Sequence, residues 1–284
     1  MISIVTWNIQ CGKGADGVLD LDRIAQVIRA MADADVICLQ EVARHDPSLD
    51  GAGADQVAFL AARFFQHEAF FGAALDRAGP SRSRRRQFGN VLLSRLPVLE
   101  VCTMPLPQPA EPGIKHMRRA AIEAVIAASG GPLRVTTTHL EYHSAAHRAA
   151  QVDTLRAMHE EACANTARPP LDPGEGPYRF VPRPPAAVLC GDFNFGPGDA
   201  EYRRMTAPFG DGLPPLRDAW TLRHGKHPHD PTCGIYDRAQ WPQGPHCRDF
   251  FFVSDAVANR VKDVVVDTKT NASDHQPVLL VLDF

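Results

Sequence analysis

Short apolar runs, each ending next to a polar residue, recur along the whole chain. They lie at residues 2–7, 36–39, 91–93, 187–190, 250–253, 261–266 and 278–282. Alternating apolar and polar positions at 121–126 and 133–137 predict two further strands, joined by a hairpin at Gly130-Gly131. Runs of this length are typical of strands and too short for most helices. We therefore expect strands to dominate the fold.

Three segments between these runs have the period of a helix. Asp20 can cap a helix whose apolar face is formed by Ile24, Val27, Ile28 and Met31. A second helix is predicted over 56–65, and Ser144 can cap a third. Seven prolines between 169 and 185 predict an extended surface segment, and 222–247 is a predicted loop rich in His, Pro and Gly. Strands with helices between them indicate an α/β protein.

Length and composition limit the choices further. We expect 284 residues to form one large domain, 1–284. The net charge of −3 argues against a protein that coats nucleic acid over its whole surface, yet it permits a locally basic groove. No run is long and apolar enough for a membrane span. Seven scattered cysteines and a start without a signal-peptide pattern predict a cytoplasmic protein. A monomer is plausible, but the sequence leaves the oligomeric state open.

Polar residues that could take part in binding or catalysis stand directly beside the predicted strands. They are Asn8, Glu41, His139, Asp192, Asn194 and His275. Because strand ends of a packed sheet meet at one edge, we expect these side chains to converge on one site. Taken singly, each has a plain explanation: Glu41 is compatible with a solvated strand end, and Asp192 in Gly-Asp-Phe-Asn with a turn. Their joint occurrence favours a site.

The residue types in this set suit the hydrolysis of a phosphate ester. Carboxylates of Glu41 and Asp274 are hard oxygen ligands of the kind Mg²⁺ or Mn²⁺ prefers, and Asn8 adds a neutral oxygen. Asp192 can take a proton from water, and histidines can donate hydrogen bonds to developing charge. Asp249 is available to orient one of these histidines.

Seven short motifs resemble those of the endonuclease/exonuclease/phosphatase family, the DNase-I-like metallophosphoesterases. In the family's order, and over nearly the whole chain, they are Thr6-Trp7-Asn8, Leu39-Gln40-Glu41-Val42, Gly89-Asn90-Val91-Leu92-Leu93-Ser94, Thr138-His139-Leu140, Gly191-Asp192-Phe193-Asn194, Arg248-Asp249-Phe250-Phe251-Phe252 and Ser273-Asp274-His275. The resemblance implies a four-layered α/β sandwich, in which two mixed sheets pack face to face with helices outside.

The resemblance also implies roles for individual residues. The implied metal group consists of Glu41 as principal ligand, Asn8 beside it, and Asp274. The implied catalytic group consists of Asp192 to activate water, Asn194 to orient the phosphate, His275 to stabilise the transition state, Asp249 to orient His275, and His139. We expect substrate contacts from Asn90, Arg119 and Trp241.

His139 places the chain nearest to the histidine-containing branch of the family. Within that branch the stretch from His139 to Glu141 is most similar to small bacterial members and to 5′-tyrosyl-DNA phosphodiesterases. Gln10 stands where several nuclease members have an aspartate. The sequence therefore leaves open whether one or two metal ions bind. The predicted substrate is a phosphodiester in nucleic acid or a DNA end. The alternatives are a small-molecule or lipid phosphoester, such as an inositol phosphate or sphingomyelin, and a binding module without catalysis.

For two regions the sequence allows more than one interpretation. The basic run 82–86 is either a solvated loop or a surface that follows phosphates. In the loop 222–247, the spacing of His and Cys does not match a zinc finger. Trp241 in this loop either contacts the substrate or anchors the loop to the core.

Overall fold

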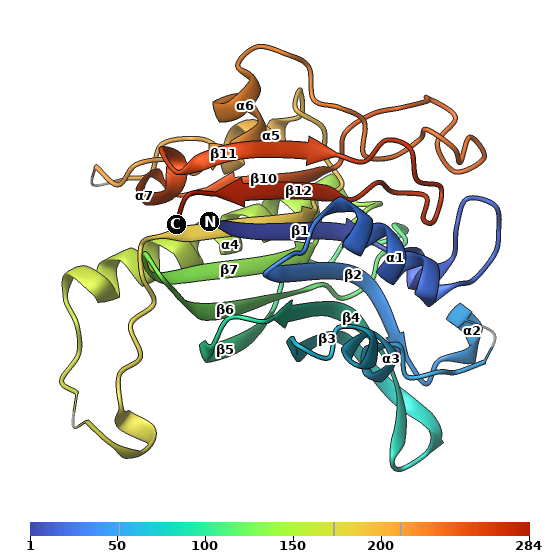
Figure 1. Cartoon of the computed structure of the whole chain (residues 1–284), viewed down its shortest axis with the longest axis horizontal. Helices are drawn as coiled ribbons and strands as arrows, with labels where there is room; N and C mark the ends of the chain where they lie inside the picture. Colours follow the sequence, from blue (N-terminus) through green and yellow to red (C-terminus); the bar gives the residue numbers. More distant parts are fainter. Residues whose placement is uncertain (51, 173, 211) are drawn as a thin grey trace.

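The computed structural model describes residues 1–50, 52–172, 174–210 and 212–284. Within these residues the chain forms two mixed six-stranded sheets that pack face to face (Figure 1). The order in the first sheet is β11 (Val261–Val266), β12 (Val278–Leu282), β1 (Ile2–Asn8), β2 (Val36–Arg44), β4 (Arg84–Ser94) and β3 (Glu68–Ser81). The order in the second is β5 (Val98–Pro105), β6 (Ala120–Ala128), β7 (Gly131–His139), β8 (Ala187–Asp192), β10 (Asp249–Val253) and β9 (Arg217–Asp218).

Helices cover the outer faces of both sheets. The long helices are α1 (Leu21–Met31), α3 (Gln56–Arg63) and α4 (Ala145–Ala167), and Asp20, Asp55 and Ser144 cap their first turns. The short elements are α2 (Pro47–Asp50), α5 (Ala200–Met205), α6 (Ala219–His224), α7 (Asp255–Ala258), η1 (Gln10–Gly12) and η2 (Gly176–Tyr178). This is the four-layered DNase-I-like α/β sandwich that the resemblance implied.

Three apolar clusters hold the layers together. Ile4 of β1 lies in the cluster between the sheets, whereas its neighbour Val5 packs in the cluster beneath α1 and α3. The third cluster includes Phe250 and Phe252 of the second sheet together with Val152 and Leu155 of α4. Each such side chain contributes about 1.5–3 kcal/mol when fully buried. Both faces of the central strands are buried, which explains their nearly continuous apolar sequence.

In the first sheet, β1 ends beside a bulge in its parallel neighbour β2, which continues to Arg44. β1 and β2 pair in parallel, with Asn8 opposite Gln40. The register of β2 against β4 shifts between Leu39 and Val42, and Glu41 within this bulge has a φ of +57°. A bulge redirects side chains that a regular strand would place on alternate faces. The backbone of β2 is thus irregular at the residue expected to bind metal.

In the second sheet, three candidate residues stand in one row. His139 of β7 lies opposite Asp192 of β8, and Asp192 lies opposite Asp249 of β10. Gly191 has a φ of +134°, and a Cβ there would be 1.9 Å from the carbonyl oxygen of Thr138. Only glycine permits this approach of β8 to β7, which brings Asp192 level with His139.

Several predicted elements need correction. β3, β5 and β9 were not predicted, and β4 begins at Arg84 rather than at residue 91. The basic run 82–86 is therefore not wholly a loop, since backbone pairing of β3 with β4 carries its last three arginines into a strand. Likewise α6 occupies the first three residues of the predicted loop 222–247. Short helices and polar strand ends have too few periodic positions to be predicted.

Other expectations are confirmed. The strands at 2–7, 36–39, 187–190 and 278–282 are present, and β6 and β7 form the expected hairpin. In the proline-rich segment, 169–172 and 174–179 are exposed and contain one short turn of helix, while Pro173 lies outside the described residues. In the part of the chain that the structure describes, a membrane crossing would need a longer and more apolar helix than any present.

Candidate active site

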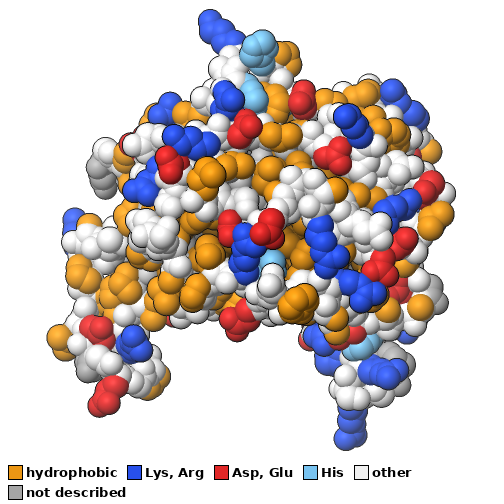
Figure 2. All heavy atoms as spheres, viewed as in Figure 1, with side chains coloured by type: hydrophobic (Ala, Val, Ile, Leu, Met, Phe, Trp, Pro, Cys, Tyr) orange, Lys and Arg blue, Asp and Glu red, His pale blue; other side chains and the backbone are white. Residues whose placement is uncertain are grey.

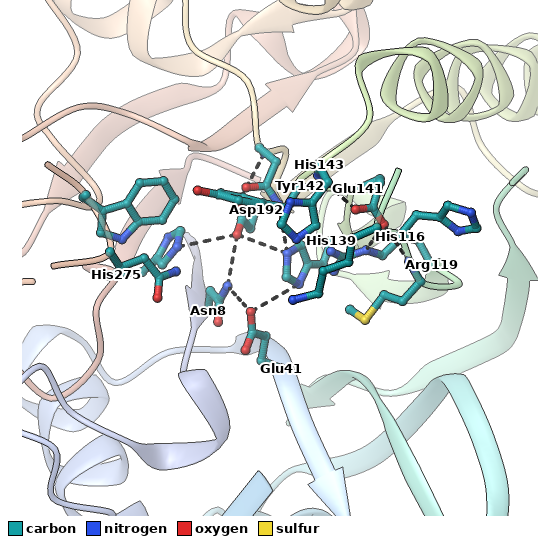
Figure 3. Close-up of a pocket in the computed structure, with 15 residues that line it drawn as sticks. Asn8, Glu41, His116, Arg119, His139, Glu141, Tyr142, His143, Asp192 and His275 are labelled. Carbon is teal, nitrogen blue, oxygen red and sulfur yellow. Dashed lines mark hydrogen bonds and ion pairs between the residues drawn. The ribbon is translucent and has the colours of Figure 1, made fainter. Parts of the chain in front are cut away.

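A pocket of about 400 Å³ opens at the edge where these strands end (Figure 3). Both sheets contribute to it, as do the segment before β6, the segment after β7 and the loop before β10. Its lining residues are Asn8, Glu41, Lys115, His116, Met117, Arg119, His139, Glu141, Tyr142, His143, Asp192, Asn194, Gln240, Trp241 and His275. The structure thus brings together all six strand-end residues that the sequence singled out.

Asn8 joins the two acidic residues of the pocket across the gap between the sheets. Its Nδ2 donates to Oε1 of Glu41 at 3.1 Å and to Oδ2 of Asp192 at 3.0 Å. Burial and the nearby carboxylate of Asp274 raise the pKa of Glu41 to about 7. A carboxylate in this state favours a cation beside it, because the amide of Asn8 offsets only part of the cost of burial.

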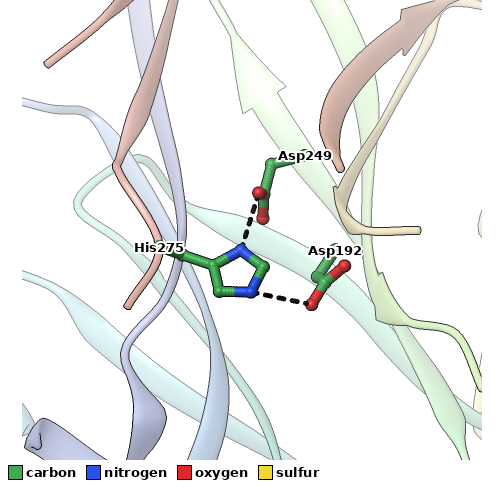
Figure 4. A group of neighbouring side chains, drawn as sticks. All are labelled: Asp192, Asp249 and His275. Atoms are coloured by element: carbon green, nitrogen blue, oxygen red, sulfur yellow. Dashed lines mark hydrogen bonds and ion pairs between the residues drawn. The ribbon is translucent and has the colours of Figure 1, made fainter. Parts of the chain in front are cut away.

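His275 bridges two carboxylates of the second sheet (Figure 4). Its Nδ1 donates to Oδ2 of Asp249 at 2.8 Å, and its Nε2 lies 3.6 Å from Oδ2 of Asp192. Burial alone would lower the pKa of His275, but the carboxylates of Asp249, Asp192 and Asp274 outweigh it and raise the pKa well above its usual value. A protonated imidazole donates from both nitrogens and has no lone pair for a metal ion.

Asp192 is buried between two further site residues. Burial raises its pKa, the positive charge of His275 acts in the opposite direction, and Asp249 raises it again. The backbone N–H of Asn194 donates to Oδ1 of Asp192 at 2.9 Å. Asp192, Asp249 and His275 hold ligand atoms within 4.8 Å of one another, a cluster that could also hold a metal ion.

His139 is neutral, and its contacts indicate which nitrogen carries the proton. The amide nitrogen of Asn194 lies 3.0 Å from the carbonyl oxygen of Leu140 and 3.0 Å from Nε2 of His139. The carbonyl accepts, which fixes the amide orientation, so Nε2 accepts as well and the proton lies on Nδ1. Burial, Arg119 and His275 keep the pKa of His139 well below its usual value. Among the described residues, Nδ1 has no hydrogen-bond partner, so it can donate to a ligand in the pocket.

Glu141 is a pocket residue to which the sequence assigned no role. Its carboxylate accepts from the backbone N–H of Met117 and His143 and from Nε of Arg119, which joins the two segments that flank the pocket. Burial lowers the pKa of Arg119, whereas Glu141 acts to raise it. Nη1 of Arg119 is buried, and no described residue accepts from it. The available signal was the position of Glu141, two residues after the strand end at His139.

The remaining predicted residues occupy different surroundings. Nδ2 of Asn90 donates to the carbonyl oxygen of Ala120 at 2.9 Å, and Asn90 does not line the pocket. Asp274 is buried and does not line the pocket, and its Oδ1 accepts from the hydroxyl of Ser273 at 3.2 Å. Trp241 is 1% exposed and packs edge-on against His275, with ring centroids 5.7 Å apart. Trp241 thus both anchors its loop and forms a wall of the pocket.

Two histidines of the loop 222–247, His224 and His229, contact residues outside the loop. His224 contacts the carbonyl oxygen of Val264, and His229 contacts the carboxylate of Asp218 at 2.6 Å. His246 contacts the carbonyl oxygen of Gly244. These contacts give His224, His229 and His246 partners within the protein.

Comparison with known proteins finds similarity over nearly the whole chain. The family model for the Endonuclease/Exonuclease/phosphatase family matches residues 5–275. Among curated proteins, no sequence matches significantly.

Solved structures of three relatives illustrate the range. An endonuclease/exonuclease/phosphatase from Beutenbergia cavernae is 27% identical, covers 99% of this chain and 71% of its own, and has a TM-score of 0.71. D. rerio TDP2, solved with a single-strand DNA product, is 19% identical, with coverages of 100% and 99% and a TM-score of 0.63. The mannosyl-6-phosphatase Bt3783 of Bacteroides thetaiotaomicron is 16% identical, with complete coverage of both chains and a TM-score of 0.65.

Proposed function

The chain belongs to the endonuclease/exonuclease/phosphatase family and is a phosphoester hydrolase, and we propose that it hydrolyses phosphodiester bonds in nucleic acid or at DNA ends. The observation that carries this proposal is the convergence of Asp192, His139, His275 and Glu41 on one pocket. The residue roles below are part of the proposal.

Glu41, with Asn8 beside it, is the proposed site for one Mg²⁺ or Mn²⁺ ion, and Asp274 adds negative charge behind it. The raised pKa of Glu41 and its partly exposed side chain (27%) support this choice. The cluster of Asp192, Asp249 and His275 fits a cation less well, because His275 is protonated. When bound, the ion neutralises and orients a phosphoryl oxygen.

Asp192 acts as the base that takes a proton from the attacking water. Its raised pKa makes it a stronger base than an ordinary aspartate. The amide hydrogens of Asn194 go to Leu140 and His139, so its side-chain oxygen is the atom that can accept from the attacking water near this carboxylate. His275, held by Asp249, donates a hydrogen bond from Nε2 to the charge that develops on the phosphate, and His139 donates from Nδ1.

Arg119 and Trp241 are proposed to contact the substrate directly. Nη1 of Arg119 is a buried donor at the pocket, and the Nε1 of Trp241 is a second. Within the described residues both donors lack an acceptor, and an unsatisfied buried donor costs about 1–3 kcal/mol. A phosphate or leaving-group oxygen would satisfy them. The role of Asn90 is indirect, through the segment at Ala120 that precedes β6.

The pocket alone also suits a small phosphoester. Its volume of about 400 Å³ lies at the lower end of the range for small-ligand pockets. A small-molecule phosphatase or phosphodiesterase is therefore the second candidate. A binding module without catalysis is disfavoured, because folding does not require both Asp192 and His275.

Hydrolysis by wild type and Asp192→Asn, each with Mg²⁺, Mn²⁺ or EDTA, tests the proposal. The substrates are single- and double-stranded DNA, a 5′-phosphotyrosyl oligonucleotide, an inositol polyphosphate, sphingomyelin and an aryl phosphodiester. We expect metal-dependent cleavage of a nucleic-acid substrate that Asp192→Asn abolishes. Cleavage restricted to inositol phosphate or sphingomyelin would favour the second candidate, and activity undiminished in EDTA would refute the metal assignment.

A further inference from the structure

A second groove, of about 830 Å³, lies directly beside the catalytic pocket. The two share His116, Met117 and Arg119 as lining residues. The far wall of the groove is the stretch of β3 from Ala73 to Arg77, and its floor includes the end of β5. The groove therefore leads from the catalytic pocket to the β3–β4 hairpin.

The hairpin carries arginines whose charge the protein does not compensate. Arg77 of β3 lies directly opposite Arg86 of β4, and Arg84 stands two residues further along the same strand. All three are exposed, and Arg118 is an exposed cation of the groove itself. Across the described chain, no carboxylate forms an ion pair with any of these four arginines. Like charges directly opposite each other destabilise a strand pair.

Neighbouring positions of the same hairpin show that this imbalance is local. Asp76 lies opposite Gln87, the next pair along the strands, and accepts from Gln87 at 3.1 Å and from Arg85. Successive residues of a strand point to opposite faces. One face of the hairpin is thus neutralised by its own residues, whereas the face with Arg77 and Arg86 is not.

The position and length of this surface suit an extended anion. The hairpin projects from the end of the sandwich where β1 ends (Figure 1), and Lys and Arg side chains gather on this projection in the same view (Figure 2). From Ala73 to Ser81, β3 extends over at most about 26 Å at about 3.3 Å per residue. That span is too long for a small phosphoester.

We propose that this groove and the arginine face of the hairpin bind the phosphate backbone of a single-stranded nucleic acid whose scissile ester lies in the catalytic pocket. The proposal rests on the proposed function and deepens it, because it makes an oligonucleotide the substrate. Continuity with a pocket that acts on phosphoesters favours nucleic acid over other polyanions. The competing explanation is that the arginines only protect β3, an edge strand, from pairing with other chains.

Binding of a fluorescent single-stranded oligonucleotide, measured in EDTA by anisotropy over a range of salt concentrations, tests the proposal without catalysis. Arg77→Gln/Arg86→Gln is compared with the charge-matched control Arg168→Gln/Arg179→Gln, at exposed arginines outside the groove. We expect Kd to rise roughly tenfold only in the first variant. The slope of log K against log salt should become less steep by about 1.4, at about 0.7 for each lost single-strand contact.

Three results would overturn the proposal: equal Kd and slope in wild type and Arg77→Gln/Arg86→Gln, an equal loss in the control pair, or tighter binding to anionic phospholipid vesicles than to the oligonucleotide. Activity on the aryl phosphodiester, measured in parallel with metal, separates this outcome from failure of the proposed function. If wild type hydrolyses the aryl ester and Arg77→Gln/Arg86→Gln binds the oligonucleotide as tightly as wild type does, the proposed binding surface alone is refuted.

Discussion

Two clusters of buried charge lie on opposite faces of the second sheet, and they differ in how completely the protein satisfies them. Beneath α4, Arg134 donates to Glu123 at 2.9 Å, contacts Nδ1 of His159 at 2.7 Å and donates to the carbonyl oxygen of Pro184 at 2.7 Å. Glu123 also accepts from Arg183 and from Thr136. The polar side-chain atoms of this cluster all have partners among the described residues.

The proposed catalytic cluster, by contrast, keeps unsatisfied groups; it consists of Asn8, Glu41, Arg119, His139, Asp192, Asp249 and His275. Nδ1 of His139, Nη1 of Arg119 and Oδ1 of Asp249 are buried, and the described residues supply no partner for them. Glu41 and Asn194 also have positive φ angles of 57° and 53°, a conformation that costs energy in residues other than glycine.

The direction of the pKa shifts repeats this difference. Burial tends to raise the pKa of both Glu123 and Glu41. At Glu123, however, Arg134 and Arg183 reverse the effect and lower the pKa. No such reversal occurs at Glu41, whose pKa rises to about 7. A buried charge with all its partners stabilises a fold, whereas a buried charge that lacks them is arranged for a ligand.

Loss of the base should give the largest effect on activity. We expect Asp192→Asn to lower kcat by about 10³-fold, within the range for loss of a general base, because the amide cannot accept the proton. Steady-state hydrolysis of the aryl phosphodiester measures this, with Asp153→Asn on the surface of α4 as the control. A loss below tenfold would assign the base to another residue.

The cluster beneath α4 should respond in the opposite way. Glu123→Ala leaves Arg134 buried without its main partner, and we expect the free energy of unfolding to fall by about 3–5 kcal/mol. Denaturant unfolding measures this loss, with the exposed Glu160→Ala as control. Where the variant is folded, kcat should stay near the wild-type value. A large loss of kcat in folded protein would show that the two clusters are not independent.

A smaller effect should appear on acidification. Burial, together with Arg134, lowers the pKa of His159 to about 4. Below pH 6.5 His159 binds a proton in the unfolded chain but stays neutral in the folded protein. The free energy of unfolding therefore decreases as the pH falls from 6.5 towards 4. Between pH 8 and pH 5 this amounts to roughly 2 kcal/mol. Denaturant unfolding of wild type and His159→Gln at both pH values isolates the contribution of His159. An identical pH dependence of the two proteins would contradict the prediction.

The sequence predicted the proposed catalytic cluster but not the cluster beneath α4. The residues of the catalytic cluster stand at the ends of short apolar runs, so their convergence follows from strand pairing. Glu123 and Arg134 lie inside the alternating runs 121–126 and 133–137, where polar positions predict exposure. Only the packing of α4 over them shows that they are buried.

The hairpin illustrates a second limit. The apolar run 91–93 predicted only the last part of β4, because the first residues of the strand are exposed arginines without an apolar pattern. Cross-strand register with β3 then decides which arginines face each other, and register is not visible in a single sequence.

Thermal unfolding of wild type and Glu41→Gln in EDTA at pH 8 tests the central claim that the catalytic cluster holds charge the fold alone does not compensate. Since the Glu41 carboxylate is partly exposed, we expect the neutral side chain to stabilise the metal-free protein by about 1–2 kcal/mol, with a higher Tm than wild type and than the exposed control Glu100→Gln. Added Mg²⁺ or Mn²⁺ should raise the Tm of wild type but not of Glu41→Gln. A lower Tm for Glu41→Gln in EDTA, or an equal response to metal, would contradict the account.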